Sequence, residues 1–346
     1  MTGTRQVTGR LTALGGMFLA SLLAIALVVG VSVGIRDLPI PLSTTWSAVT
    51  NRLGWTSVEL SRIHETVIWD YRLSRALVAA FCGAGLALSG AIMQSLLRNP
   101  LAEPYVLGIS AGASSGAVAI VILGIGSGAF SLSMGAFAGA FAAFLFVALL
   151  SNGTRGGADR TILAGVAASQ LFNATTSYIV TTTGNAQQAR DVMFWLLGSF
   201  GGVRWPEFVL VSIVVGLGLA ACLMAARILD AFAFGDEAAS ALGVNVGRAR
   251  ITLFALTALM TATIVSMVGS IGFVGLVVPH AARYFVGPTH IRLLPACAIA
   301  GAIFMVLADI ASRVLIPQQT LPVGVVTALV GVPFFSLILY RFQRAS

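Results

Sequence analysis

The chain has 346 residues, of which 58% are hydrophobic and only 9% are charged, whereas soluble domains carry about 25% charged residues. This composition excludes an ordinary water-soluble domain and indicates a membrane protein. The net charge is +8, and all 20 basic residues are arginine. Because a P-loop needs a lysine for the nucleotide phosphates, the chain cannot hydrolyse ATP by that route. Arginine in loops between apolar segments does not indicate nucleic-acid binding.

Uncharged apolar runs recur along the chain, and most reach the ~20 residues that a helix needs to cross a bilayer. Backbone groups in hydrocarbon must pair within their own segment, and the alternating pattern of a membrane strand barrel is absent. We therefore expect an all-α polytopic protein with one transmembrane domain over residues 1–346 and about ten helices. The expected spans are roughly residues 11–35, 72–97, 104–124, 129–150, 161–183, 206–227, 250–270, 273–286, 292–311 and 322–341.

The first apolar run could be mistaken for a signal peptide, since it follows Arg5 and Arg10. It is longer than the ~7–15 residues of a signal h-region, so we interpret it as a retained span. With ten spans both termini lie on one side of the membrane. Twelve of the 20 arginines then lie on the side of the termini, and the positive-inside rule places that side in the cytoplasm. All five tryptophans fall near the opposite, outer side.

Three arginines stand at the outer ends of spans, against the positive-inside tendency. Arg72 and Arg75 lie at the entrance of the second span, and Arg313 lies at the end of the ninth. Asp309 precedes Arg313 by four residues, a spacing that permits an ion pair on a helix. These arginines either contact lipid headgroups or a local carboxylate, or bind carboxylates of a partner protein, for which the guanidinium fork is well suited.

A proline-bounded turn, "RNPLAEP", separates the second and third spans. Asn99 precedes Pro100 and is pushed out of the α region, so the helix ends there. Small residues at four-residue spacing follow, and they let helices approach closely in lipid, so we expect them to serve packing alone. These glycines are Gly108, Gly112, Gly116, Gly135 and Gly139.

The polar inner loop of residues 228–250 contains "GDEAASALG", which predicts a short helix. Asp236 and Glu237 suit its N-terminus, and Gly243 suits its end. The loop is either a solvated connection or a helix that docks into another protein and transmits motion.

The sequence contains no cluster of residues typical of a catalytic or metal-binding site. The three cysteines fall inside spans, the three histidines do not cluster, and the acids near span interiors, Glu103 and Asp309, lie toward their ends. We therefore expect no catalytic residue, metal or cofactor. A secondary transporter, which needs a coupling-ion site near the midplane, and a membrane enzyme are the alternatives from other classes, and both are disfavoured.

Several segments resemble the permeases of the type II ABC importers that take up iron–siderophores, haem and cobalamin. They extend from about residue 72 to residue 335 and include "RLSRALVAAFCGAGLALSGAIMQSLLRNPLAEPYVLGISAGA", "FWLLGSFGGVRW", "FGDEAASALGVNVGRAR" and "GSIGFVGLVVPHAARYFVG". Ser74 departs from the family pattern, in which proline is common between the two arginines.

The resemblance implies a homodimer in a bacterial inner membrane, with two ABC ATPase subunits on the cytoplasmic side and one periplasmic substrate-binding protein. It implies that Arg72, Arg75 and Arg313 dock onto glutamates of the binding protein. Coupling helices at about residues 230–247 would contact the ATPase, and their proposed contact residues are Asp236, Glu237, Ala241, Leu242 and Gly243. The cytoplasmic gate would include Asn99, Leu101, Ala158 and Asp159.

The substrate is not fixed by these motifs. "FWLLGS" is more similar to the iron and haem branches, and the expected path has few charged groups. We favour haem, with a ferric siderophore or cobalamin as the alternatives.

Overall fold

The computed structural model describes residues 23–34, 40–124, 131–151, 158–316 and 319–343. This part of the chain is helical and contains no strand. Much of the first expected span, and residues 125–130 between the third and fourth expected helices, lie outside the described residues.

Each of the ten expected spans corresponds to a described helix. By length and composition five of the described helices can cross a bilayer, and four further apolar helices are shorter, so the count of ten spans is approximate. The helices are Leu23–Gly34, α4 (Ser74–Leu96), α5 (Ile109–Leu123), α6 (Leu132–Leu150), α7 (Ala158–Thr183), α9 (Trp205–Met224), α12 (Val246–Val268), α13 (Val274–Val286), α14 (His290–Val314) and α15 (Val323–Gln343).

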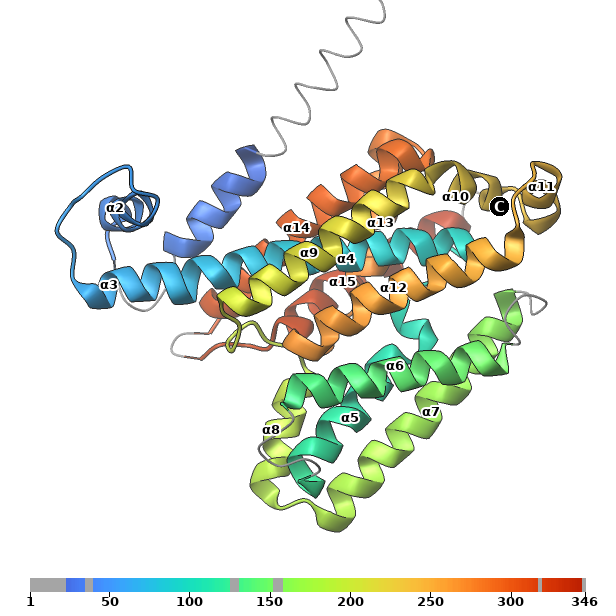
Figure 1. The fold of residues 1–346 in the computed structure, drawn as a ribbon, viewed down its shortest axis with the longest axis horizontal. Helices are drawn as coiled ribbons and strands as arrows, with labels where there is room; N and C mark the ends of the chain where they lie inside the picture. The colour runs from blue at the N-terminus through green and yellow to red at the C-terminus, as the bar shows by residue number, and fades with distance from the viewer. Residues whose placement is uncertain (1–22, 35–39, 125–130, 152–157, 317–318, 344–346) are drawn as a thin grey trace, which may run out of the picture.

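Helix α4 lies at the centre of the bundle, where it contacts α9, α12, α13 and α14 (Figure 1). Nearly all of its residues are buried, because the segment is rich in alanine, glycine and serine and lets neighbouring backbones approach closely. A Cβ added at Gly83 would collide with the carbonyl oxygen of Gly301 in α14, and one at Gly90 with that of Gly275 in α13.

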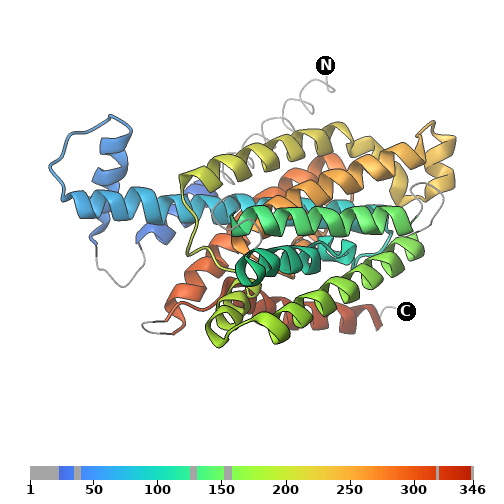
Figure 2. The ribbon, with the colours of Figure 1, turned by 60° about the horizontal axis from the view of Figure 1, so that its bottom comes forward.

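Helices α5, α6 and α7 form a second group beside this bundle (Figures 1 and 2). The predicted packing role of the glycine stripe is confirmed between α5 and α6. A Cβ on Gly112 would collide with the carbonyl oxygen of Gly139, and one on Gly116 with that of Gly135. Gly108 has a conformational role instead. It adopts φ 71° at the junction between the 3₁₀ helix η2 (Pro104–Leu107) and α5.

Three helices, α2, α3 and α8, were not expected from the sequence. Figure 1 shows that two of them, α2 and α3, project at one end of the bundle, which we call the α2 end. The opposite end, called the α11 end, carries α10 and α11, where coupling helices were expected at about residues 230–247. The bounds of these helices are α2 (Leu42–Arg52), α3 (Arg62–Thr66), α8 (Ala186–Leu196), α10 (Ala226–Ala233) and α11 (Asp236–Ala241).

The second span begins earlier than residue 72. Helix α3, the π-helical turn η1 (Val67–Leu73) and α4 are continuous, so that one helix extends over Arg62–Leu96. A single π-helical insertion within an α-helix shifts the side chains that follow it and is frequent at functional sites. Arg72 lies inside this insertion and Arg75 lies just after it.

Candidate functional site

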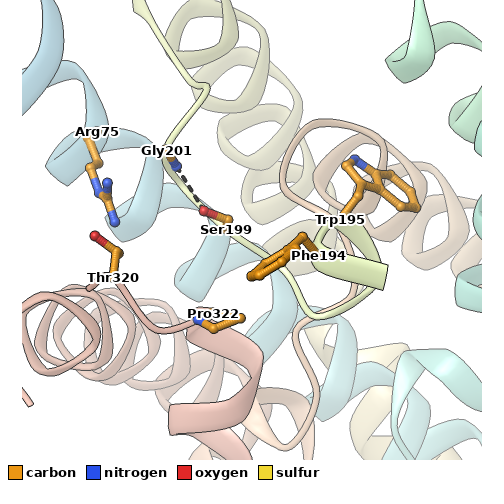
Figure 3. Close-up of a pocket in the computed structure, with 7 residues that line it drawn as sticks. All are labelled: Arg75, Phe194, Trp195, Ser199, Gly201, Thr320 and Pro322. Atoms are coloured by element: carbon orange, nitrogen blue, oxygen red, sulfur yellow. Dashed lines mark hydrogen bonds between the residues drawn. The ribbon is translucent and has the colours of Figure 1, made fainter. Parts of the chain in front are cut away.

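A pocket of about 270 Å³ lies at the α2 end (Figure 3). Helix α4, the end of α8, the loop after α8 and the segment before α15 all contribute to its wall. Its lining residues are Arg75, Phe194, Trp195, Ser199, Gly201, Thr320 and Pro322.

Backbone hydrogen bonds hold the walls of this pocket together. The Ser199 N–H donates to the Val268 carbonyl at 2.8 Å, and the Val323 N–H donates to the Gly198 carbonyl at 2.9 Å. Ser199 Oγ also accepts the Gly201 N–H at 3.1 Å, the contact drawn in Figure 3. The loop after α8 therefore joins the end of α12 to the start of α15.

A second cavity, of about 550 Å³, is lined by the end of α8, the segment before α13 and helix α15. The two cavities share no lining residue, but consecutive residues line them at the end of α8, with Phe194 and Trp195 in the first and Leu196 and Leu197 in the second. None of the lining residues is charged: they are Leu196, Leu197, Ser270, Gly272, Phe273, Gly324, Val325, Ala328, Leu329, Val332 and Pro333. Among the residues that line the two cavities, Arg75 carries the one formal charge.

Arg75 is held by an ion pair with Asp309 of α14. Its Nη2 lies 2.7 Å from Asp309 Oδ1, and its Nε lies 3.0 Å and 3.2 Å from Oδ1 and Oδ2. Arg313 Nη2 lies 3.2 Å from Asp309 Oδ2, which confirms the pair expected from the four-residue spacing. Asp309 is completely buried, so these contacts are little weakened by solvent.

The three arginines expected to dock a partner belong to one buried network. Arg72 Nη1 donates to the Val33 carbonyl at 3.0 Å, and Arg313 Nη2 donates to Ser32 Oγ at 2.7 Å, so both also hold the helix Leu23–Gly34. Arg72, Arg75 and Arg313 are 3%, 6% and 9% exposed. The local ion pair considered from the sequence is thus present, and docking would require access to side chains that the chain itself holds.

The turn with the expected gate residues lies at the α11 end. Asn99 Oδ1 accepts the Leu101 N–H at 2.9 Å, and the Asn99 carbonyl accepts the Ala102 N–H at 3.0 Å, so the asparagine side chain shapes the turn. Arg98 adopts φ 47°, an uncommon conformation for a residue with a side chain. Leu101 is 41% exposed and thus free to contact another element.

The other two expected gate residues begin α7. Ala158 packs against the main core, and Asp159 is exposed. The same helix contacts η2, which follows the Asn99 turn: a Cβ on Gly165 would collide with the Val106 carbonyl oxygen. The fold therefore connects α7 with the chain that leaves the turn.

The expected coupling helix, α11, presents its end to the surface. Leu242 is 72% exposed, and Glu237, Ala241 and Gly243 are exposed as well. Asp236 instead points back, with Oδ1 2.6 Å from Arg250 Nη2 of α12. Asp236 therefore anchors α11 to α12, while Glu237, Ala241, Leu242 and Gly243 remain exposed.

Sequence reasoning missed two features near the turn. The Tyr105 hydroxyl accepts the Ile271 N–H at 2.9 Å and donates to the Ile271 carbonyl at 3.0 Å, which fixes η2 to the segment before α13. Burial raises the pKa of the Glu103 carboxyl above its usual range, and a backbone hydrogen bond from Phe273 partly offsets this. Only the flanking prolines could have signalled this packed turn. Within the described ranges no three metal-ligating side chains lie together.

Apolar helices of this length and composition are those of a polytopic membrane protein. The FecCD transport family matches residues 22–341. The chain is 37% identical to the cobalamin import system permease protein BtuC of Halobacterium salinarum, covering 93% of this chain and 87% of the relative. It is 36% identical to the hemin transport system permease protein HmuU of Yersinia pestis, covering 90% and 91%.

One solved structure is similar in fold, with a TM-score of 0.82 and 28% identity over 94% of this chain and 99% of the other. It is described as an inward-facing conformation of a putative metal-chelate type ABC transporter. The chain belongs to the FecCD transport family and is a permease of the type II ABC importer class.

Proposed function

We propose that the chain is the transmembrane subunit of an ATP-driven importer that receives haem from a periplasmic binding protein and releases it into the cytoplasm. The observation that carries the proposal is the lining of the two cavities, which includes one charged side chain, Arg75, and that side chain is paired with Asp309. Such a wall suits passage of a bulky, largely apolar ligand without tight capture, because the binding protein supplies the affinity.

Haem is favoured over a charged ferric chelate by the same lining. The large cavity offers leucine, valine, alanine and Phe273 to a planar macrocycle. A ferric siderophore or cobalamin remains the alternative for the same path.

A homodimer would complete this path. The α15 face beside the large cavity exposes apolar side chains, among them Leu329 at 64% and Val332 at 47%. A second copy on this face would bury them and enclose the cavity between two subunits. The proposed assembly adds two ABC ATPases at the α11 end, in an inner membrane with both chain termini on that cytoplasmic side.

The α2 end would meet the binding protein through Arg72, Arg75 and Arg313. Arg75 lines the surface pocket in Figure 3, which gives a partner carboxylate one route to the network. Since all three are buried and hydrogen-bonded, a docking glutamate would have to exchange with Asp309 or with the carbonyls of residues 32 and 33. Docking would then loosen the contact between α14 and the helix Leu23–Gly34.

ATPase movement would enter through α11 and reach the gate by alternating access. Leu242, Ala241 and Glu237 form the exposed contact, and Asp236 transfers force to α12 through Arg250. The turn at Asn99 and Leu101, with the start of α7 at Ala158 and Asp159, would open and close the inner end of the path.

Co-purification tests the class of transporter. A separately encoded P-loop ATPase that stays bound to this chain through detergent extraction supports the importer. Transport of haem into vesicles by the chain alone, driven by an ion gradient, would instead support a secondary transporter.

Docking is tested by reversing the charge at Arg72, Arg75 or Arg313 in the reconstituted complex and measuring ATP hydrolysis with the binding protein added. Loss of stimulation in variants that still elute as folded complexes supports the assignment, and Arg190→Glu, an exposed arginine at the same end, is the control. Unchanged stimulation contradicts it.

The substrate is tested by the absorption spectrum of the cognate binding protein purified with its ligand. A Soret band indicates haem. A weak charge-transfer band indicates a ferric siderophore, and a corrinoid spectrum indicates cobalamin.

A further inference from the structure

Three polar side chains from three helices are joined in a line at the α11 end. Ser95 lies near the end of α4, His290 is the first residue of α14, and Asp230 lies in α10. Ser95 Oγ is 2.6 Å from His290 Nε2, and His290 Nδ1 is 2.6 Å from Asp230 Oδ1. Ser95 and His290 are 7% and 3% exposed, whereas the Asp230 side chain is 33% exposed. The line therefore leads from the surface into the bundle.

The Asp230 carboxylate holds the end of α14 at two points. A carboxylate can only accept hydrogen bonds, so the proton at this contact belongs to His290 Nδ1. The same Oδ1 accepts the backbone N–H of His290 at 2.9 Å. The N-cap residue of α14, Thr289, makes no side-chain capping bond. Asp230 thus caps α14 from a neighbouring helix, where the helix dipole favours a negative charge.

At the Ser95 end, this series of contacts reaches the turn that contains Asn99. The Ser95 carbonyl accepts the Arg98 N–H at 3.3 Å. The Arg98 side chain extends toward the start of α11. Its Nη1 would lie 3.2 Å from a Cβ atom added to Gly235, the residue before α11. The segment of α10 and α11 therefore touches the turn directly through Arg98 and indirectly through Asp230, His290 and Ser95.

The sequence of contacts, Ser–His–Asp, is also that of hydrolase triads. Here the serine hydroxyl is buried in the packing of α4 against α14, so a substrate carbonyl has no access to it. Ser95 Oγ also lies 3.0 Å from the Ala91 carbonyl of its own helix. These contacts connect helices and do not form a nucleophilic site.

We infer that Ser95, His290 and Asp230 are positioning residues that couple movement of α10 and α11 to the turn at Asn99. Because Asp230 holds the first residue of α14, and that residue holds the last turn of α4, α10 cannot shift without displacing α14 or breaking the line. This inference rests on the proposed function, since it needs an ATPase that moves α11.

The experiment follows the turn itself, so it does not depend on the substrate. The native cysteines at 82, 222 and 297 are all buried, so a nitroxide on Leu101→Cys labels one position in each subunit. The labelled chain is reconstituted with its co-purifying ATPase, and the spectral change on adding ATP and vanadate is compared with the rate of ATP hydrolysis.

Ser95→Ala and His290→Ala should reduce the spectral change about tenfold for a given ATPase rate, within the usual range of coupling between two sites. Ser95→Thr keeps the hydroxyl and should restore the response. Ser89→Ala is the matched control, because Ser89 is a buried serine of the same helix whose hydroxyl has no hydrogen-bond partner among the described residues. It should behave like the wild type.

Equal responses in wild type and Ser95→Ala would overturn the relay while leaving the importer intact. The relay would also be overturned if each variant lost its response only in proportion to its loss of folded protein, which thermal unfolding of each variant measures. If His290→Ala does not fold, the comparison of Ser95→Ala, Ser95→Thr and Ser89→Ala still decides. A wild-type chain that binds no ATPase would overturn the proposed function and the relay together.

Discussion

Replacing Asp309 by asparagine should destabilise the protein more than any other single change of one acid to its amide. The Asp309 side chain is completely buried and accepts three contacts of 2.7–3.2 Å from Arg75 and one of 3.2 Å from Arg313. Asparagine keeps the shape but removes the charge, and its amide group places donors against two guanidinium groups that are themselves donors.

The size of the effect follows from burial. Removing one partner of a buried ion pair costs about 3–5 kcal/mol, because the remaining charge stays out of water without compensation. An exposed pair contributes about 0–1 kcal/mol. The Arg75 and Asp309 side chains are 7% and 0% exposed, so the larger range applies, at its lower end because asparagine retains one acceptor.

The assay is reversible unfolding of the purified chain in mixed micelles, with Glu59→Gln as the control, since Glu59 is exposed at the same end. The charge swap of Arg75→Asp with Asp309→Arg should recover part of the lost stability. A cost below about 1 kcal/mol for Asp309→Asn, the value of an exposed pair, would refute the reasoning that this network holds the α2 end together.

Three further predictions follow from packing, burial and exposure. Gly139→Ala should cost about 1–3 kcal/mol by forcing α5 and α6 apart, whereas Gly216→Ala, with open space around it, should be neutral or stabilising; equal effects would contradict the close approach. Because burial raises the Glu103 pKa from 4.5, the folded state binds the proton more tightly, and stability falls as pH rises above that value. Glu103→Gln should therefore gain more thermal stability over wild type at about pH 8 than at about pH 4, and a pH-independent difference would contradict this. Leu242→Ala should weaken ATPase association by about tenfold, whereas Leu53→Ala, at an exposed leucine of the opposite end, should not. The affinity is measured by titrating the ATPase onto the chain in nanodiscs, and equal affinities of the two variants would contradict the prediction.

The order of the helices could be predicted from the sequence because the bilayer imposes a simple length rule on uncharged segments. A close helix contact at the glycine stripe was also predictable, because small residues at four-residue spacing let two helices approach closely in lipid. The pair of Asp309 with Arg313 followed from helical periodicity alone.

Contacts between distant segments could not be predicted in this way. Arg75 and Asp309 are 234 residues apart, and Ser95 and His290 are 195 apart, so no local pattern links them. Helix α8 escaped prediction because it is short and only partly apolar, although Asn185 and Gln188 form a capping box that marks its start. The contacts of His290 left no signal in the sequence, because its partners Ser95 and Asp230 lie far from it along the chain.

The continuous helix over Arg62–Leu96 has a mechanical consequence. Its 35 residues correspond to about 52 Å at 1.5 Å per residue, whereas the hydrocarbon core is about 30 Å thick. A tilt near the usual ~20° removes little of the difference, so the part of the helix before the expected span at residue 72, at the α2 end, extends beyond the hydrocarbon core. The same continuous helix runs through the bundle to Ser95, beside the Asn99 turn, and so connects the two ends of the molecule within one element.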